Sequence, residues 1–440
     1  MWRQRNLSLK GKVTVINSLA AALMVYPCTT LDTPENIIKE TDKIFCDFLW
    51  NGKVNKIARN TVIKQIEQGG LKMTDMTSKI KSLKITWIKR AINNPTSSWK
   101  LIIDDMVGIP FEYLVRCTGV HQNLLDKLPK FYRNIMNDLN TIRNNKSDVI
   151  SEILHETIWL NKNITVDQKT IFWRRWFHNG IRYIGDLLDS VGNFLSQDKL
   201  NNKYQINCTF MDHLRVRQAI PGSWRQTLEF KKINYTEYIN ANRPLYIYNN
   251  DNTEPPRSSA FDLLTTKSKL LYWKFVNIRV SNLPPTCLSR WEKQYTIDHR
   301  IWPLIFGAPF KVCRETRLQS FQYRTIHRIL PCNVWLYIRK IVNSNDCSYK
   351  YCTNHSLDDI SHYLVTCPPV GRFWESFVTW WNGLDYSKLY PLVEENIILG
   401  FPIANNEDIV LNYSLILAKY YIYCSKKYQR PINFLEFLPF

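Results

Sequence analysis

Apolar residues recur with a helical period along most of this chain, whereas the alternation typical of strands is scarce. Three such patterns lie near the N-terminus: one in residues 13–26, one that begins at Pro34 and continues to Leu49, and one in residues 76–87. Turn-forming pairs such as Asn51-Gly52 separate the patterns. The sequence therefore predicts a mainly α fold that opens with a small helical bundle.

Composition and turn signals predict four regions. Residues 1–92 form a basic helical bundle, and residues 93–170 form a linker with short helices. Residues 171–312 form a helical middle region, and residues 313–440 hold a basic helix, a small Cys/His module and flanking C-terminal helices. The run 249–259, which contains two adjacent prolines, is expected to be a loop.

The chain carries a strong positive charge. Of its 440 residues, 58 are Lys or Arg and 38 are Asp or Glu, so the formal net charge is +20. Residues 1–100 hold 17 basic and 7 acidic side chains, which is half of the excess. This balance favours a polyanionic partner, of which nucleic acid is the commonest. The two Gly-Lys pairs lack the Ser or Thr of a phosphate-binding loop, so we expect no ATPase. We also expect no small-molecule substrate.

Residues 13–31 carry no charge and follow four basic residues, which is the outline of a signal peptide. Polar residues and Pro27 interrupt this stretch, and it falls short of the roughly 20 apolar residues of a membrane-spanning helix. Eleven cysteines are an odd count, and several lie inside helical patterns, as expected for reduced thiols. We therefore expect an intracellular protein, cytoplasmic or nuclear, without a membrane partner.

The sharpest chemical signal is a group of three cysteines and one histidine, Cys347, Cys352, His362 and Cys367. Three thiolates and one imidazole complete a tetrahedral zinc site with no open position, which suits a structural ion. His355 follows Cys352 closely and is a competing ligand. From spacing alone the alternative stays open that these are three unrelated buried thiols and a surface histidine.

A basic helix precedes this group. Arg314, Arg317, Arg324 and Arg328 fall within a narrow arc of a helical wheel, and Phe321 projects among them. Arginines follow phosphates and an exposed ring stacks on a base, so this face suits single-stranded or irregular nucleic acid. The alternative is a solvated basic face with the phenylalanine packed against a neighbouring domain.

No group of residues predicts catalysis. Asp104-Asp105 is the acidic pair in an apolar setting, but it lacks a partner carboxylate on a comparable segment, which two-metal chemistry requires. Asp358-Asp359 lies inside the Cys/His group and is typical of a turn. The aromatic residues of 373–381 recur at helical spacing and are expected to be core.

Several short motifs follow one another in a specific order. They are WRQRNLSLKGKV at 2–13, FLWNGK at 48–53, GGLKMTD at 69–75, SLKITW at 82–87, GIRYIGD at 180–186, TRLQSFQYR at 316–324, HRI at 327–329 and FW at 373–374. In this order they resemble the C-terminal part of the reverse-transcriptase polyprotein of long interspersed (non-LTR) retrotransposons. The resemblance is scattered over almost the whole chain.

The resemblance implies a thumb-like region in 1–92, a wrist-like region in 171–312 and a zinc knuckle whose ligands are Cys347, Cys352, His362 and Cys367. The first ligand spacing is longer than the family's and one extra residue precedes His362, a departure that affects Cys347 most. The family's polymerase aspartates and endonuclease would lie upstream of residue 1. The resemblance thus implies handling of template and primer without phosphoryl-transfer chemistry.

These observations predict a non-catalytic, nucleic-acid-binding part of a retrotransposon reverse transcriptase. It would grip template RNA or RNA–DNA hybrid, with structural Zn²⁺ as cofactor and an upstream polymerase domain as a further partner. The candidate contacts are Arg3, Arg5, Lys10, Lys12, Lys53, Lys56, Arg59, Arg314, Arg317, Phe321, Arg324 and Arg328. The alternatives are a domesticated or remnant helical interaction module, and an inactive piece that works only with a palm domain supplied in trans.

Overall fold

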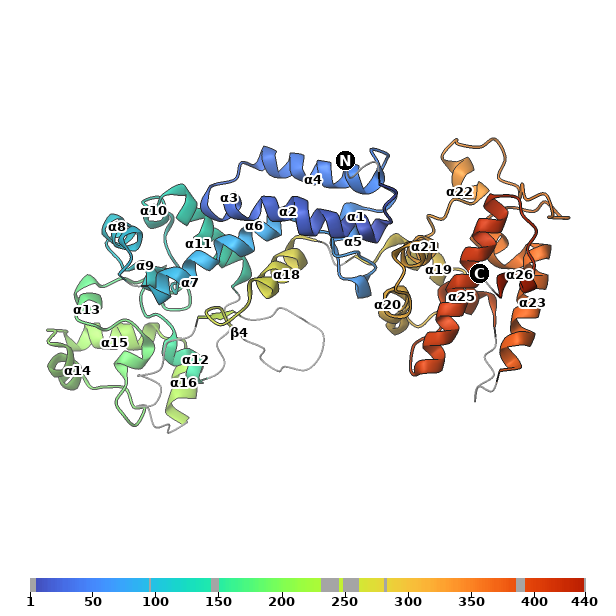
Figure 1. The fold of residues 1–440 in the computed structure, drawn as a ribbon. Helices are drawn as coiled ribbons and strands as arrows, with labels where there is room; N and C mark the ends of the chain where they lie inside the picture. The colour runs from blue at the N-terminus through green and yellow to red at the C-terminus, as the bar shows by residue number, and fades with distance from the viewer. Residues whose placement is uncertain are drawn as a thin grey trace. The chain divides into compact units, whose positions relative to one another are not determined.

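The computed structural model describes residues 5–94, 96–143, 150–230, 245–247, 261–280, 283–384 and 392–438. Over these residues the fold is mainly α, which confirms the prediction (Figure 1). The strands described are two short antiparallel pairs, β1 (Thr165–Val166) with β2 (Lys169–Thr170), and β3 (Tyr246–Ile247) with β4 (Phe261–Asp262). The expected loop at 249–259 lies outside the described residues.

The chain divides into two compact units that are discontinuous in sequence. Unit 1 comprises Met1–Met24, Pro34–Met76 and Val280–Phe440, and unit 2 comprises Val25–Thr33 and Thr77–Arg279. The division into four sequential regions stays a prediction, because these units group residues by their contacts.

The N-terminal part of unit 1 begins with α1 (Leu9–Val15), in which the Ser8 hydroxyl accepts a hydrogen bond from the Gly11 amide. The helix continues as a π-helical turn, η2 (Ile16–Ala20), and α2 (Ala21–Leu23). Helix α4 (Glu35–Trp50) packs on α1 and ends at Asn51, whose φ of 58° is left-handed. Two short helices follow, α5 (Arg59–Ile63) and η3 (Ile66–Gln68).

The C-terminal part of unit 1 consists of helices (Figure 1). Their buried apolar residues, among those that the structure describes, form two larger clusters and one small one. The helices are α19 (Thr286–Glu292), η5 (His299–Ile301), α20 (Trp302–Val312), α21 (Thr316–Ile326), α22 (Asn333–Ile338), η6 (His362–Thr366), α23 (Pro368–Asn382), α24 (Glu394–Leu399), α25 (Asn406–Lys427) and α26 (Phe434–Phe437). Phe373, Trp374, Phe377 and Trp381 of α23 are buried against α25. The expectation that these aromatic residues are core is confirmed.

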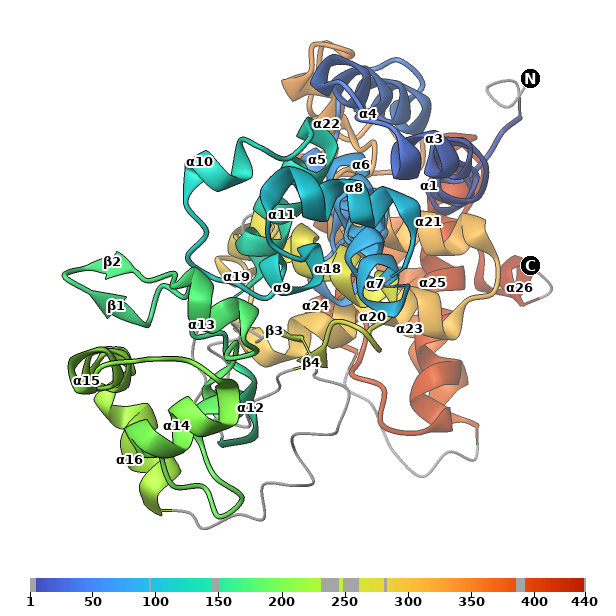
Figure 2. The same ribbon diagram turned by 90° about the vertical axis from the view of Figure 1, so that its left-hand side faces the viewer.

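Unit 2 is a second helical body (Figure 2). It has its own core, which includes the fully buried Trp159. Its helices are α3 (Val25–Thr30), α6 (Met76–Lys84), α7 (Thr86–Asn93), α8 (Ser98–Val107), α9 (Phe111–Leu114), α10 (Gln122–Leu125), α11 (Lys130–Ile142), α12 (Ile150–His155), α13 (Arg174–His178), η4 (Ile184–Leu187), α14 (Gln197–Tyr204), α15 (Phe210–Ala219), α16 (Gly222–Phe230) and α18 (Ser268–Arg279). Asp104 lies on α8, where its carboxylate accepts hydrogen bonds from the Phe111 amide and the Lys100 ammonium.

Among the helices that the structure describes, none combines the length and the apolar character needed to cross a bilayer. All eleven cysteines lie in the described ranges, and each is a free thiol.

Candidate metal centre and nucleic-acid interface

Cys347, Cys352, His362 and Cys367 converge in unit 1. All four are buried, and their ligand atoms lie within 4.8 Å of one another. The Cys352 Sγ atom is 3.7 Å from the His362 Nε2 atom. Such separations match ligands that share a tetrahedral ion with metal–sulfur bonds of about 2.3 Å. The four side chains could therefore hold one metal ion.

Tight turns and one helix end present these ligands. The Cys347 amide donates to the Ser356 carbonyl, and the Cys352 amide donates to the Tyr349 carbonyl. His362 is the first residue of η6, where its amide donates to the Asp359 carboxylate at 2.8 Å. Cys367 is the N-cap of α23, which Pro368 opens. Proline suits this position because the first amides of a helix have no intrahelical partner.

Neighbouring groups orient the ligands. The Ser356 hydroxyl lies 2.9 Å from the Nδ1 atom of His362, which leaves Nε2 to face the sulfur atoms. His355, the competing ligand, lies outside the group of four, and its Nδ1 atom is 3.1 Å from the Cys347 carbonyl oxygen. The long first spacing accordingly does not exclude Cys347 from the group. It is accommodated by the turn at residues 347–352.

The surrounding hydrogen bonds and charges favour the ionised form of Cys347. Hydrogen bonds from the Cys367 thiol and from His362, together with the positive charge of Lys426, lower the pKa of Cys347. Lys426 is buried, with its ammonium 3.4 Å from the Asp358 carboxylate and 4.2 Å from the centre of the Tyr363 ring. A buried cation next to thiols stabilises their thiolate form, which is the form that binds metals.

The four arginines of the predicted basic helix do not form one continuous stripe. Arg314 precedes α21 and is exposed, as is Arg317 in its first turn. Arg324 is half-buried, and burial lowers its pKa. The helix ends at Ile326, so Arg328 lies beyond it in a left-handed conformation with a φ of 56°.

The prediction of an exposed Phe321 ring is wrong. Phe321 is only 5% exposed, and its ring centre lies 5.4 Å from those of Tyr420 and Tyr423 on α25. The helical wheel placed it among the arginines, but the neighbouring helix covers that side of α21. Phe321 is therefore a packing residue that no base can reach in the folded chain.

Two of the N-terminal candidates, Lys12 and Arg59, use their charged groups in hydrogen bonds and ion pairs within the protein. The Lys12 ammonium is buried and donates to the Leu49 carbonyl at 3.1 Å and to the Asn51 side chain. The prediction that Lys12 contacts nucleic acid is wrong for this conformation. Arg59 lies 2.5 Å from the Asp42 carboxylate and 3.0 Å from the Asp75 carboxylate, which neutralise its charge.

The remaining candidates differ in exposure. Arg5 and Lys53 are exposed, whereas Lys10 is half-buried with its ammonium 5.8 Å from the centre of the Phe310 ring. Lys56 is half-buried, with its ammonium 5.1 Å from the centre of the Trp335 ring. Arg3 lies outside the described residues.

Unit 1 also contains a basic pocket that the sequence did not predict. It has a volume of about 710 Å³, and its lining includes Lys56, Arg290, Lys293, Arg328 and Arg339. Three of these residues were not candidates, because each is unremarkable in its own segment. Only the packing of distant segments brings them together. One local signal for part of this surface is the excess of basic residues in 311–340, seven against one Glu.

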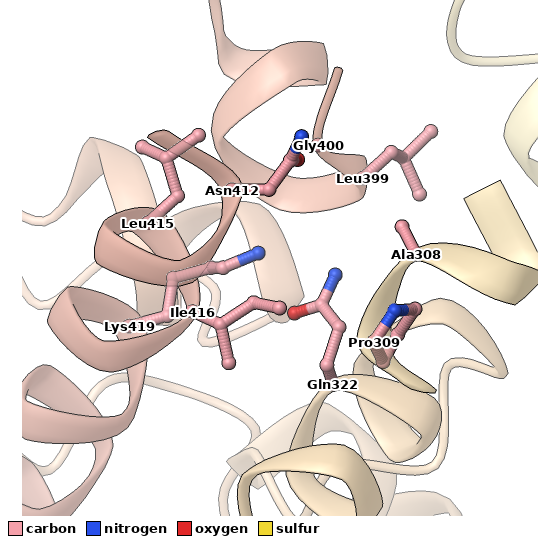
Figure 3. A pocket seen from close by; sticks show the side chains of 9 residues that line it. All are labelled: Ala308, Pro309, Gln322, Leu399, Gly400, Asn412, Leu415, Ile416 and Lys419. Atoms are coloured by element: carbon pink, nitrogen blue, oxygen red, sulfur yellow. The ribbon is translucent and has the colours of Figure 1, made fainter. Parts of the chain in front are cut away.

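A second, small pocket has the polar side chains of Lys419, Gln322 and Asn412 in its lining (Figure 3). The fully buried Lys419 of α25 and Gln322 of α21 point toward each other across it. Both donate to the Ile398 carbonyl at 2.8 Å, near the end of α24. Burial lowers the pKa of Lys419 to about 7. These two side chains tie α24 to α21 and α25, and the pocket offers no room for a ligand.

Comparison with known proteins gives a weak relation. No family model matches the chain. One curated relative, named "Putative ribonuclease H protein", from Arabidopsis thaliana, is 25% identical over 109 residues, which are 23% of this chain. The match covers 17% of that protein's length. The chain thus has a distant relation to a ribonuclease H-like protein and a Cys/His group that could hold a metal.

Proposed function

We propose that this chain is a non-catalytic, nucleic-acid-binding part of a retrotransposon reverse transcriptase that holds RNA or RNA–DNA hybrid. The convergence of Cys347, Cys352, His362 and Cys367, in a unit that also contains a basic pocket, carries the proposal. The net charge of +20 and the order of the sequence motifs support it. The named relative also supports it, because a ribonuclease is a protein that acts on RNA.

We infer that the metal is zinc. Three soft thiolates and an imidazole favour zinc over magnesium or calcium, and four protein ligands leave no position for a reacting water. Such a site would bind the ion for stability and not for catalysis. Three thiolates around a divalent cation leave a net negative charge, which the buried Lys426 would offset.

The nucleic acid would be held through its phosphates. The exposed candidates for this role are Arg5, Lys53, Arg314 and Arg317. Each phosphate contact releases condensed counterions, so affinity should fall steeply as the salt concentration rises. Bond-making would occur in another domain, as the resemblance implies.

A binding experiment tests this proposal. Fluorescence anisotropy would measure the affinity for a 20-base-pair RNA–DNA hybrid between 50 and 200 mM salt. We expect R314E combined with R317E to weaken binding and to reduce the salt slope by about one unit for each residue. The matched control combines K127E with K162E, which changes the same charge at two exposed lysines of unit 2 that are not candidates.

Two results would contradict the proposal. If the wild-type protein ignores the hybrid at 50 mM salt, the chain does not have this function. If the R314E and R317E protein behaves like the K127E and K162E protein, those arginines are not contacts. Primer extension by the isolated chain should give no nucleotide incorporation, and incorporation would contradict the non-catalytic assignment.

A further inference from the structure

The basic pocket of unit 1 lies around α22, and we call it the α22 pocket. Its basic lining residues are Lys56, Arg290, Lys293, Arg328 and Arg339, and its lining contains one carboxylate, from Asp359. A volume of about 710 Å³ is in the range of pockets that bind small ligands or one nucleotide, and it is far too small for a duplex.

An aromatic ring forms part of the pocket wall. Trp335 is half-buried on α22, with the Arg339 guanidinium carbon 3.7 Å and the Lys56 ammonium 5.1 Å from its ring centre. The indole N–H group of Trp335 is buried and has no hydrogen-bond partner among the described residues. A tryptophan flanked by two cations is a typical environment for a stacked base and its phosphate.

The cations in the pocket repel one another. Burial and the positive charges of Arg324, Lys53 and Arg339 lower the pKa of Lys56. Burial and the charge of Arg290 likewise lower the pKa of Arg339. One carboxylate does not balance five cations, so a bound anion would relieve this repulsion.

Arg328 is held in place before any ligand arrives. Its φ of 56° is rare for a residue other than glycine, and such strain is found at ligand-binding sites more often than elsewhere. Its guanidinium carbon lies 4.1 Å from the centre of the Trp291 ring, and its Nη1 atom donates to the Gln294 side chain at 2.9 Å. The guanidinium group is therefore preorganised at the pocket wall.

We propose that the α22 pocket binds one unpaired nucleotide of a single-stranded nucleic acid, with the base against Trp335 and the phosphate among Lys56, Arg328 and Arg339. This rests on the proposed function and specifies the form of the strand. A base inside a duplex is stacked on its neighbours and cannot enter a pocket of this size. Single-stranded RNA and DNA share the required chemistry, so the test includes both.

Anisotropy with ten-nucleotide oligo(U), oligo(dT) and a blunt 20-base-pair RNA duplex tests the pocket. We expect W335L to bind the single strands about tenfold more weakly, since stacking on an aromatic ring contributes about this much per base. We expect its duplex affinity to be unchanged and W335F to restore most of the loss. K56Q combined with R339Q, at a half-buried and an exposed residue, should show the same selectivity. The control, R314Q combined with R317Q, should weaken all ligands together.

The outcomes separate this proposal from the proposed function. If the wild type binds the single strands and W335L binds them equally well, the pocket assignment is wrong while the function stands. If W335L weakens single strands and duplex equally, the residue does not select an unpaired base, and the assignment again fails. If the wild type binds no nucleic acid, both fail. Thermal melts check folding, and cross-linking of 5-iodouracil in the oligonucleotide to Trp335 should be detected by mass spectrometry.

Discussion

The buried charge of Lys419 is expected to destabilise the folded protein at neutral pH. The lysine ammonium is completely buried between α21, α24 and α25 and has the Ile398 carbonyl as its hydrogen-bond partner. Gln322 donates to the same carbonyl, so that oxygen keeps a donor when the lysine is replaced. We expect K419M to stabilise the protein at pH 7, because methionine fills a similar space without a charge to bury.

The magnitude follows from the pKa. Burial lowers the pKa of Lys419 from 10.5 to about 7, and each pKa unit corresponds to about 1.4 kcal/mol. The full shift corresponds to about 5 kcal/mol, and because a lysine of pKa 7 is half deprotonated at pH 7, the burial cost at that pH is about 4 kcal/mol. The lost hydrogen bond offsets about 1 kcal/mol of the gain, which leaves a stabilisation of about 3 kcal/mol.

The lowered pKa of Lys419 also determines how the free energy of unfolding changes with pH. Between pH 7 and about 10 the unfolded chain binds a proton at Lys419 more often than the folded chain does, so this residue makes the wild type more stable as the pH rises. The advantage of K419M should therefore shrink from pH 7 to pH 10 and vanish near the upper end. Other titrating groups are common to both proteins and largely cancel in the difference.

Urea unfolding at pH 7, 8, 9 and 10 measures this difference. K127M is the matched control, since it removes an exposed lysine of unit 2 and should give a small, pH-independent change. A K419M protein that is less stable than the wild type at pH 7 would refute the reasoning. A constant difference across the four pH values would also refute it, because the lysine would then be charged in both states.

Further predictions concern the metal centre and α21. Cys367→Ser should reduce the zinc content of the purified protein from one equivalent to almost none and lower its melting temperature, while C424S, outside the group of four, should retain the metal. Zinc would be excluded if elemental analysis finds none in the wild-type protein and if a chelator leaves its melting temperature unchanged. Phe321→Ala should cost about 3–5 kcal/mol in the free energy of unfolding, because a buried ring is lost from the contact with α25. Its affinity for RNA below the melting temperature should stay at the wild-type value, and a selective loss of affinity would restore the earlier prediction of an exposed ring.

Local patterns in the sequence predicted the parts of this structure that depend on neighbouring residues. Helical periodicity located α4 and the buried aromatic face of α23. The four Cys/His residues were found because their two pairs are close in sequence, so turns and a helix end bring them together. Such signals need no knowledge of how distant segments pack.

The features that the sequence did not predict all depend on distant packing. A helical wheel identified the apolar and basic faces of α21 but could not show that α25 covers Phe321. A positive charge suggested that Lys12 faces a phosphate, whereas the folded chain uses it to bind the end of α4. The α22 pocket joins Lys56 to Arg339 across almost 300 residues, and no local pattern marks such a pair.

Helix α25 contacts three features of unit 1: the ring of Phe321, the end of α24 and the metal centre. Tyr420 and Tyr423 support Phe321, Lys419 holds the end of α24, and Lys426 lies at the metal centre. Lys426 lies seven positions after Lys419, a distance of about 10 Å along the helix. Removal of the metal ion should therefore change the tilt of α25 and, with it, the packing of α25 against α21. Faster amide exchange in α21 after addition of a chelator would report this change.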